Sequence, residues 1–207
     1  MFNLYDAIND DFEFEGIKGH VDMSFDNILR LFHEIGSDDK TSGMKLSIAL
    51  YLLTGHMFEK LDIPQRVQLY NFLMQNFVLK VKPVMQLPPI MGDSSDKEEQ
   101  YYSLEEDADY IWASFKFYGI DLDLERGKLH WYKFRALLAS LPDDSKFKQV
   151  INIRMWKPEK GDSKQRIKEM RELQVVYALG VTQEDVNVAS MDFDERRQYE
   201  QTHDEMR

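Results

Sequence analysis

Three acidic residues at alternate positions, Asp121, Asp123 and Glu125, are the first candidates for chemistry in this chain of 207 residues. Such a pattern could begin a calcium loop, which needs oxygen ligands at positions 1, 3, 5 and 12 and a glycine at position 6. Counted from Asp121, position 6 is Arg126 and position 12 is Tyr132. The loop therefore lacks both its glycine and its final bidentate acid, and we expect it to bind no metal ion.

Apolar residues alternate with these acids, at Ile120, Leu122 and Leu124. The alternation predicts a short extended connection whose apolar side chains point inward. The acids then hold this connection and the first turn of the following helix, where negative charge is favourable.

Other signs of catalysis are weak. The five histidines stand at positions 20, 33, 56, 130 and 203, and none forms an i, i+4 pair that could bind zinc. The chain has no cysteine, no glycine-rich phosphate loop and no nucleophile elbow. We expect His130 to be hydrogen-bonded to backbone, and we expect no catalytic residue, no cofactor and no enzymatic activity. An enzyme whose residues meet only on folding is the alternative.

The composition limits the class of protein. Hydrophobic residues make up 43% of the chain and aromatic residues 13%, enough for a real core. No apolar run approaches the roughly 20 residues that cross a bilayer, and the acidic start does not resemble a secretory signal. The net charge of −11 opposes binding to nucleic acid. These features indicate a soluble intracellular protein without a membrane or nucleic-acid partner.

One segment reverses the local charge. It contains Lys146, Lys148, Arg154, Lys157, Lys160, Lys164, Arg166, Lys168 and Arg171. Basic residues beside Trp156 could bind nucleic acid through phosphate contacts and stacking. The alternative is a solvated helix face that also pairs with the acidic linker, and the negative charge of the whole molecule favours it.

The first half predicts a hairpin followed by three helices. Apolar residues alternate around two glycines in residues 11–23, as in a β-hairpin. Helical spacing of apolar residues then covers 25–36 after Ser24, and 44–53 before Gly55. A third helix begins near Asp62 and Pro64 and continues through residue 81.

The second half predicts four more helices. Ser103 and Glu106 fit a capping box, and the helix that they begin ends near Gly119. Further helices are predicted over 129–141, around 147–151 and over 163–180. The expected fold is mainly α, with five to seven helices and a small N-terminal β-hairpin.

Composition divides the chain into segments. We expect an N-terminal hairpin and helical lobe over 1–82, an acidic linker with prolines over 83–100 and a C-terminal helical lobe over 101–180. Residues 181–207 are rich in charge and predict a mobile tail, or a helix that orders only on a partner.

The second and third predicted helices are apolar around much of their circumference. Such helices are either central in a core or covered by a partner. Under the second interpretation, the candidate partner contacts are Leu69, Leu73 and Phe77.

The segment 107–154 resembles a bacteriophage family named after gene product fifteen of long-tailed phages. The similar residues are Ser114, Phe115, Tyr118 to Leu122, Leu129, His130, Trp131, Phe134, Leu141 and Pro142. The resemblance extends over most of residues 10–155.

The resemblance implies a tail-assembly chaperone that keeps the tape-measure protein soluble during tail morphogenesis. The expected partners are the tape-measure protein, further copies of this chain and the major tail protein. The expected location is the cytoplasm of the host bacterium during phage assembly or prophage expression. A structural component of the phage tail or neck is the alternative function.

Calcium at millimolar concentration should leave the thermal midpoint of the protein unchanged, because only a ligand bound by the native state stabilises it. The measurement is thermal unfolding with and without calcium, and with magnesium and zinc as further tests. A calcium-induced increase of several degrees that Asp121→Ala abolishes would contradict the interpretation of this loop.

Overall fold

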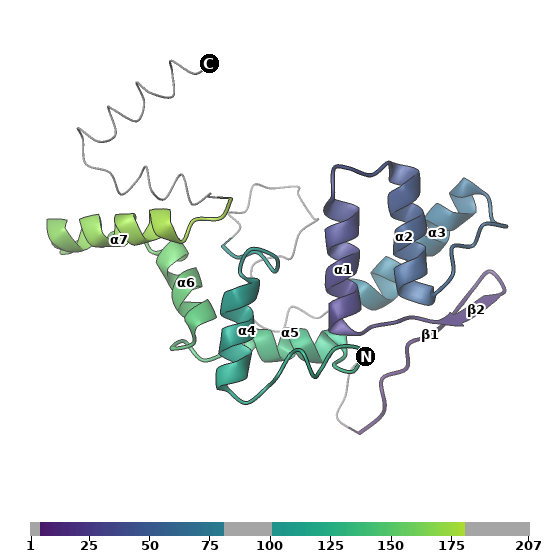
Figure 1. Ribbon diagram of the computed structural model, residues 1–207, viewed down its shortest axis with the longest axis horizontal. Helices are drawn as coiled ribbons and strands as arrows, with labels where there is room; N and C mark the ends of the chain where they lie inside the picture. The colour runs from purple at the N-terminus through teal and green to yellow at the C-terminus, as the bar shows by residue number, and fades with distance from the viewer. Residues whose placement is uncertain (1–4, 81–100, 181–207) are drawn as a thin grey trace, which may run out of the picture. The chain divides into compact units, whose positions relative to one another are not determined.

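The computed structural model describes residues 5–80 and 101–180 (Figure 1). Within these ranges the fold is mainly α, with seven α-helices, one π-helical turn and one antiparallel hairpin, as the sequence predicts. None of the helices in these ranges is both long enough and apolar enough to span a membrane. The linker predicted at 83–100 and the tail predicted at 181–207 lie outside the described residues.

The hairpin consists of two short strands, β1 (Asp11–Phe14) and β2 (Ile17–His20). Glu15 and Gly16 join them, with φ angles of 49° and 81°. A two-residue turn with both residues in the left-handed region matches the natural twist of paired strands. Gly19 lies opposite Phe12, where a Cβ atom would come within 2.7 Å of the aromatic ring. Glycine at this position therefore lets the Phe12 ring lie across the hairpin and become buried.

Three helices follow, α1 (Phe25–Gly36), α2 (Ser42–Thr54) and α3 (Ile63–Leu73). Figure 1 shows α1 and α2 side by side, with α3 crossing near them. Gly55 ends α2 in the left-handed conformation, with φ of 75°. Asp62 and Gln65 form a reciprocal capping box at the start of α3, so both predicted boundaries are confirmed.

The predicted helix over 62–81 is interrupted. After α3 the backbone continues as a π-helical turn, η1 (Met74–Val78), where Leu79 N donates to Met74 O at 2.8 Å. A π turn contains one more residue than an α turn, so side chains after it rotate relative to α3. Sequence periodicity does not reveal this change.

The second half contains α4 (Ala108–Phe117), α5 (Trp131–Ala139), α6 (Lys146–Met155) and α7 (Lys164–Val176). The chain forms two compact units. The described part of the first comprises residues 5–80 and 115–141, and that of the second comprises residues 101–114 and 142–180.

This division differs from the linear division expected from the sequence. We expected the aromatic run at 129–141 to pack a C-terminal lobe, but it belongs to the first unit. Trp131 N donates to Met23 O at 2.7 Å, and Phe25 N donates to Leu129 O at 2.9 Å. The indole nitrogen of Trp131 also donates to Val78 O at 3.3 Å. The two backbone bonds join residues more than a hundred positions apart, and the indole bond joins residues 53 positions apart.

An aromatic cluster fills the first unit. The Phe134 ring stacks with those of Phe25, Phe115 and Trp131, at centroid distances of 4.9, 5.5 and 5.7 Å. Phe32 of α1 contacts Trp131 from another side, at 5.8 Å. Offset and tilted ring pairs of this kind add to the stability gained from burial. The cluster therefore holds α1 and α5 together.

Arg154 and Asp107 form a buried ion pair in the second unit. Two guanidinium nitrogens of Arg154 donate to the two carboxylate oxygens of Asp107, at 2.6 and 2.7 Å. Asp107 also accepts from Ser103 N, while Arg154 donates to the backbone oxygens of Tyr101 and Tyr177. The Asp107 side chain is only 1% exposed. The pair thus joins the start of α4, the end of α6 and the residues after α7.

The capping box predicted at Ser103 has a different second partner. Ser103 Oγ accepts from Glu106 N at 3.1 Å, as expected. Ser103 N donates to a carboxylate oxygen of Asp107, and not to the Glu106 side chain. Glu106 accepts from Gly180 N at 2.6 Å. The ion pair with Arg154 orients Asp107 toward Ser103, which explains why Asp107 and not Glu106 accepts from Ser103 N.

Trp131→Ala should lower the free energy of unfolding by about 3–5 kcal/mol, because it removes a buried ring from the centre of the first unit. Urea denaturation followed by circular dichroism measures the loss. Phe117→Ala is the matched control, since its ring is 82% exposed. If Trp131→Ala unfolds like the parent but loses a binding partner, Trp131 belongs to an interface.

Asp107→Ala should lower the free energy of unfolding by about 3–5 kcal/mol, because it leaves the Arg154 guanidinium buried without its counter-charge. Asp109→Ala is the control, since Asp109 lies two residues away, in the first turn of α4, and is exposed. The same denaturation measurement applies. A similar small effect of both substitutions would mean that the ion pair does not stabilise the second unit.

Candidate interaction surface

Leu69, Leu73 and Phe77, the partner contacts predicted from the sequence, lie on the inner side of α3 and η1. Leu69 and Leu73 are completely buried, and Phe77 is partly buried. The rings of Phe72 and Phe77 lie with their centroids 6.4 Å apart, and Phe77 O accepts from the Tyr132 hydroxyl. These residues belong to the core of the first unit, which is the first of the two interpretations of these apolar helices. Partner contact through them stays a prediction that would require the unit to open.

A different set of apolar residues, on α2 and α3, is exposed. Met44 and Tyr51 of α2, and Ile63 and Val67 of α3, are between 40% and 68% exposed. Met44 and Tyr51 are seven residues apart and Ile63 and Val67 are four apart, so each pair lies on one side of its helix. Both helices therefore bury one apolar side and expose another.

Arg66 joins these two exposed pairs. Its terminal nitrogen donates to the Ser47 hydroxyl of α2, across the contact between α2 and α3. Ser47 lies on the same side of α2 as Met44 and Tyr51, and Arg66 is the i+3 neighbour of Ile63 on α3. We call Met44, Tyr51, Ile63, Val67 and the central Arg66 the α2–α3 face.

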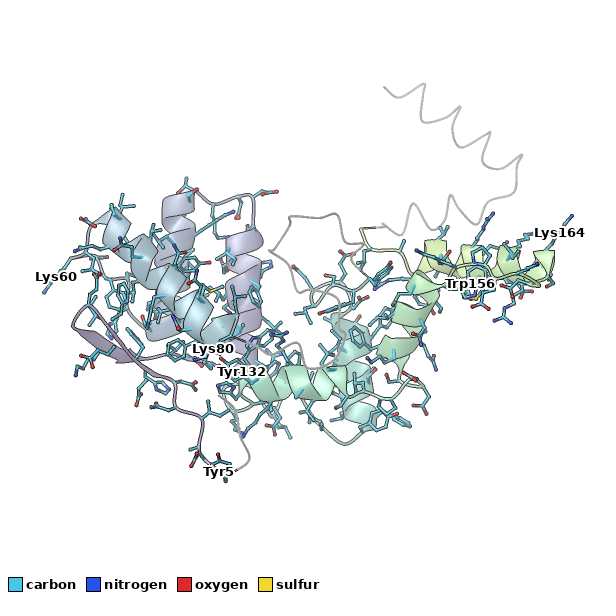
Figure 2. The ribbon with its side chains drawn as sticks, turned by 180° about the vertical axis from the view of Figure 1, so that it is seen from behind. Tyr5, Lys60, Lys80, Tyr132, Trp156 and Lys164 are labelled. Carbon is cyan, nitrogen blue, oxygen red and sulfur yellow. The ribbon has the colours of Figure 1, made fainter. Side chains whose placement is uncertain are left out.

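The α2–α3 face carries positive charge only. The chain contains 37 Asp and Glu residues, yet α2, α3 and η1 contain Lys45 and Arg66 and not one carboxylate. Asp62, the N-cap at the start of α3, already accepts from Gln65 N. Figure 2 shows this unit from behind, with Lys60 before α3 and Lys80 after η1 at well-separated positions. Acidic residues elsewhere in the chain thus leave an apolar and weakly basic face.

The acids at 121–125 hold the connection between α4 and α5. Asp121 pairs with Lys116, and this hydrogen bond holds the pKa of the Asp121 carboxyl below its usual value. Asp123 pairs with Arg126 at 2.9 Å. The connection is a series of turns instead of the extended segment that we expected, and Leu124 is exposed. Asp121 Oδ1 accepts from Asp123 N and so bends the chain locally.

His130 has a structural position. Its Nδ1 accepts from Tyr132 N at 3.1 Å and caps α5, so the ring proton must be on Nε2. Nε2 lies 3.2 Å from a carboxylate oxygen of Asp10. Burial, and to a smaller extent the charge of Asp10, raises the pKa of the neighbouring Tyr132 hydroxyl. Both ring nitrogens have protein partners, which suits a residue that connects the N-terminal segment to α5.

Several basic residues of 146–171 have partners within the second unit. The Lys146 ammonium donates to the Tyr177 hydroxyl at 2.7 Å and lies over the Tyr177 ring. Arg154 is buried against Asp107. Arg166 pairs with Asp162. The acidic linker with which we expected this segment to pair lies outside the described residues, so that pairing stays a prediction.

The sequence interpretation missed two features, the buried ion pair of the second unit and the α2–α3 face of the first. The buried pair of Asp107 and Arg154 joins residues 47 positions apart, and no local pattern predicts such a pair. The α2–α3 face could have been found from the absence of carboxylates over 42–54 and 63–78 in such an acidic chain. In the described residues, no group of three or more His, Asp or Glu side chains could hold a metal ion.

The comparisons with known proteins give one match. No curated protein and no solved structure is similar enough to match the chain. The model of the family described as "Bacteriophage Gp15 protein" matches residues 4–179, which is most of the chain. The match includes the hairpin, α1 to α7 and the aromatic segment that resembles this family. The chain therefore belongs to the bacteriophage Gp15 protein family.

Proposed function

We propose that this protein is a tail-assembly chaperone that keeps the phage tape-measure protein soluble until the tail tube forms around it. Membership of the bacteriophage Gp15 family places it among phage structural and morphogenesis proteins. The observation that carries the proposal is the α2–α3 face, an apolar surface on a chain with a net charge of −11. Such a combination suits a protein that covers the apolar stripes of a client and adds charge to the complex.

The proposed role needs no catalysis. The contacts of His130 and of the acids at 121–125 have structural roles, and we propose a protein without enzymatic activity. The proposed partners are the tape-measure protein, further copies of this chain along it and the major tail protein. Several weakly bound copies on one long client would raise each other's local concentration. The proposed location is the cytoplasm of the host bacterium.

Ile63→Asp should abolish the solubility of the co-expressed tape-measure protein, because it places a charge in the apolar contact. Ile63 is 68% exposed and begins α3, where a carboxylate is compatible with the helix dipole. Leu124→Asp is the matched control in the same unit, since Leu124 is 67% exposed away from this face. The soluble fraction of the client should fall to the level without chaperone for Ile63→Asp and stay at the parent level for Leu124→Asp.

The composition of purified phage particles provides the second readout. A chaperone is released on assembly, so the particles should lack this chain. Its presence in a fixed number of copies would contradict the proposal and indicate a structural component of the tail or neck. Failure of the parent protein to keep the tape measure soluble would also contradict it.

A further inference from the structure

We propose that the α2–α3 face binds an acidic amphipathic helix of the client, with a client carboxylate seated on Arg66. The inference rests on the proposed chaperone function and specifies which segments of the client are bound. The apolar stripe of the bound helix would pack on Met44, Tyr51, Ile63 and Val67. Residues at i, i+3, i+4 and i+7 of such a helix would supply that stripe.

The hydrogen bonding of Arg66 is the first argument. One terminal nitrogen donates to Ser47, but Nε is buried and has no acceptor in the described part of the chain. A buried donor without an acceptor is unfavourable, because it has lost its hydrogen bonds to water. A carboxylate matches the fork of Nε and a terminal guanidinium nitrogen and can accept from both. Because Nε is buried, a client carboxylate can accept from both nitrogens only when the Arg66 side chain turns toward the exposed side.

Charge is the second argument. The helices that build the face contain Lys45 and Arg66 and no carboxylate, whereas the whole chain carries a net charge of −11. A basic client helix would be attracted to almost any other surface of this protein. An acidic helix is repelled by the acidic surfaces of the chain and attracted to this face, as it is to the basic segment 146–171. The charge pattern therefore favours an acidic helix over a basic one as the occupant of the α2–α3 face.

The composition of the face supports a contact with a different protein. Arginine, tyrosine and methionine are enriched in the cores of protein interfaces, and all three occur here around one contact between two helices. A two-fold contact between two copies of this chain through the same face would bring together two surfaces that carry the same basic residues. Two like charges in a partly desolvated contact repel each other. The face thus suits a different protein better than a second copy.

Overlapping peptides that cover the tape-measure protein encoded with this chain provide the probes. Binding of each peptide to the full-length chain is measured by fluorescence anisotropy, and the acids of the tightest peptide are replaced singly by glutamine. We expect Arg66→Gln and one client Glu→Gln or Asp→Gln each to weaken binding about tenfold, as for the loss of a charged hydrogen bond. The double replacement should weaken binding no further than either alone, because both remove the same contact.

Three variants separate the contact from general effects. Arg30→Gln, on the neighbouring α1, removes an exposed arginine outside the face and should bind like the parent. Ser47→Ala removes the hydrogen bond to Arg66 but keeps the charge, and should retain binding. Arg66→Glu should bind the peptide whose critical acid is replaced by lysine more tightly than the original peptide. Thermal unfolding of each variant verifies that the first unit is folded.

The outcomes distinguish this inference from the function on which it rests. If the parent keeps the tape measure soluble but no peptide binds, or Arg66→Gln binds as the parent does, the inference is overturned and the chaperone function stands. Preferential binding of basic peptides would overturn it in the same way. If the parent fails to keep the tape measure soluble, the function is overturned, and the inference with it.

Discussion

Burial of the Trp131 ring is the interaction on which the first unit depends. Its indole nitrogen donates to Val78 O at the end of η1, and its backbone nitrogen donates to Met23 O before α1. The ring is 1% exposed and contacts Phe32 and Phe134. One side chain thus positions the start of α1, the end of η1 and α5. Because η1 continues α3, the same burial sets which side of α3 faces the core and which side is exposed as the α2–α3 face.

The second unit depends on a charged contact instead. Asp107 and Arg154 are buried together, and their bonds to Ser103, Tyr101 and Tyr177 satisfy the polar groups that burial removes from water. A buried ion pair contributes little net stability compared with apolar packing, but it tolerates few alternative arrangements. It therefore specifies how the ends of α4, α6 and α7 meet. Apolar packing mainly determines the structure of the first unit, and a network of hydrogen bonds determines that of the second.

The distribution of charge links the fold to the proposed function. Carboxylates cap helices, bend the connection at 121–125 and pair with Arg154, Lys116 and Arg126, while α2 and α3 have none. The acids can keep the chain in solution without occupying the face proposed to bind a client. Arg66, whose buried Nε has no acceptor within residues 5–80 and 101–180, would add selectivity to a contact that is otherwise apolar.

Local patterns in the sequence by themselves determined the helices, the hairpin and several boundaries, such as Gly55 and the box of Asp62 and Gln65. They also carried the resemblance to the phage family, since the aromatic motif is contiguous. Only the tertiary structure decided that Leu69 and Leu73 face inward and that Ile63 and Val67 face solvent. Both sides of α3 are apolar, so the spacing of its apolar residues does not indicate which side is buried. The grouping of residues 115–141 with the first unit was equally undetermined, because it depends on contacts such as that of Trp131 with Val78, between residues 53 positions apart.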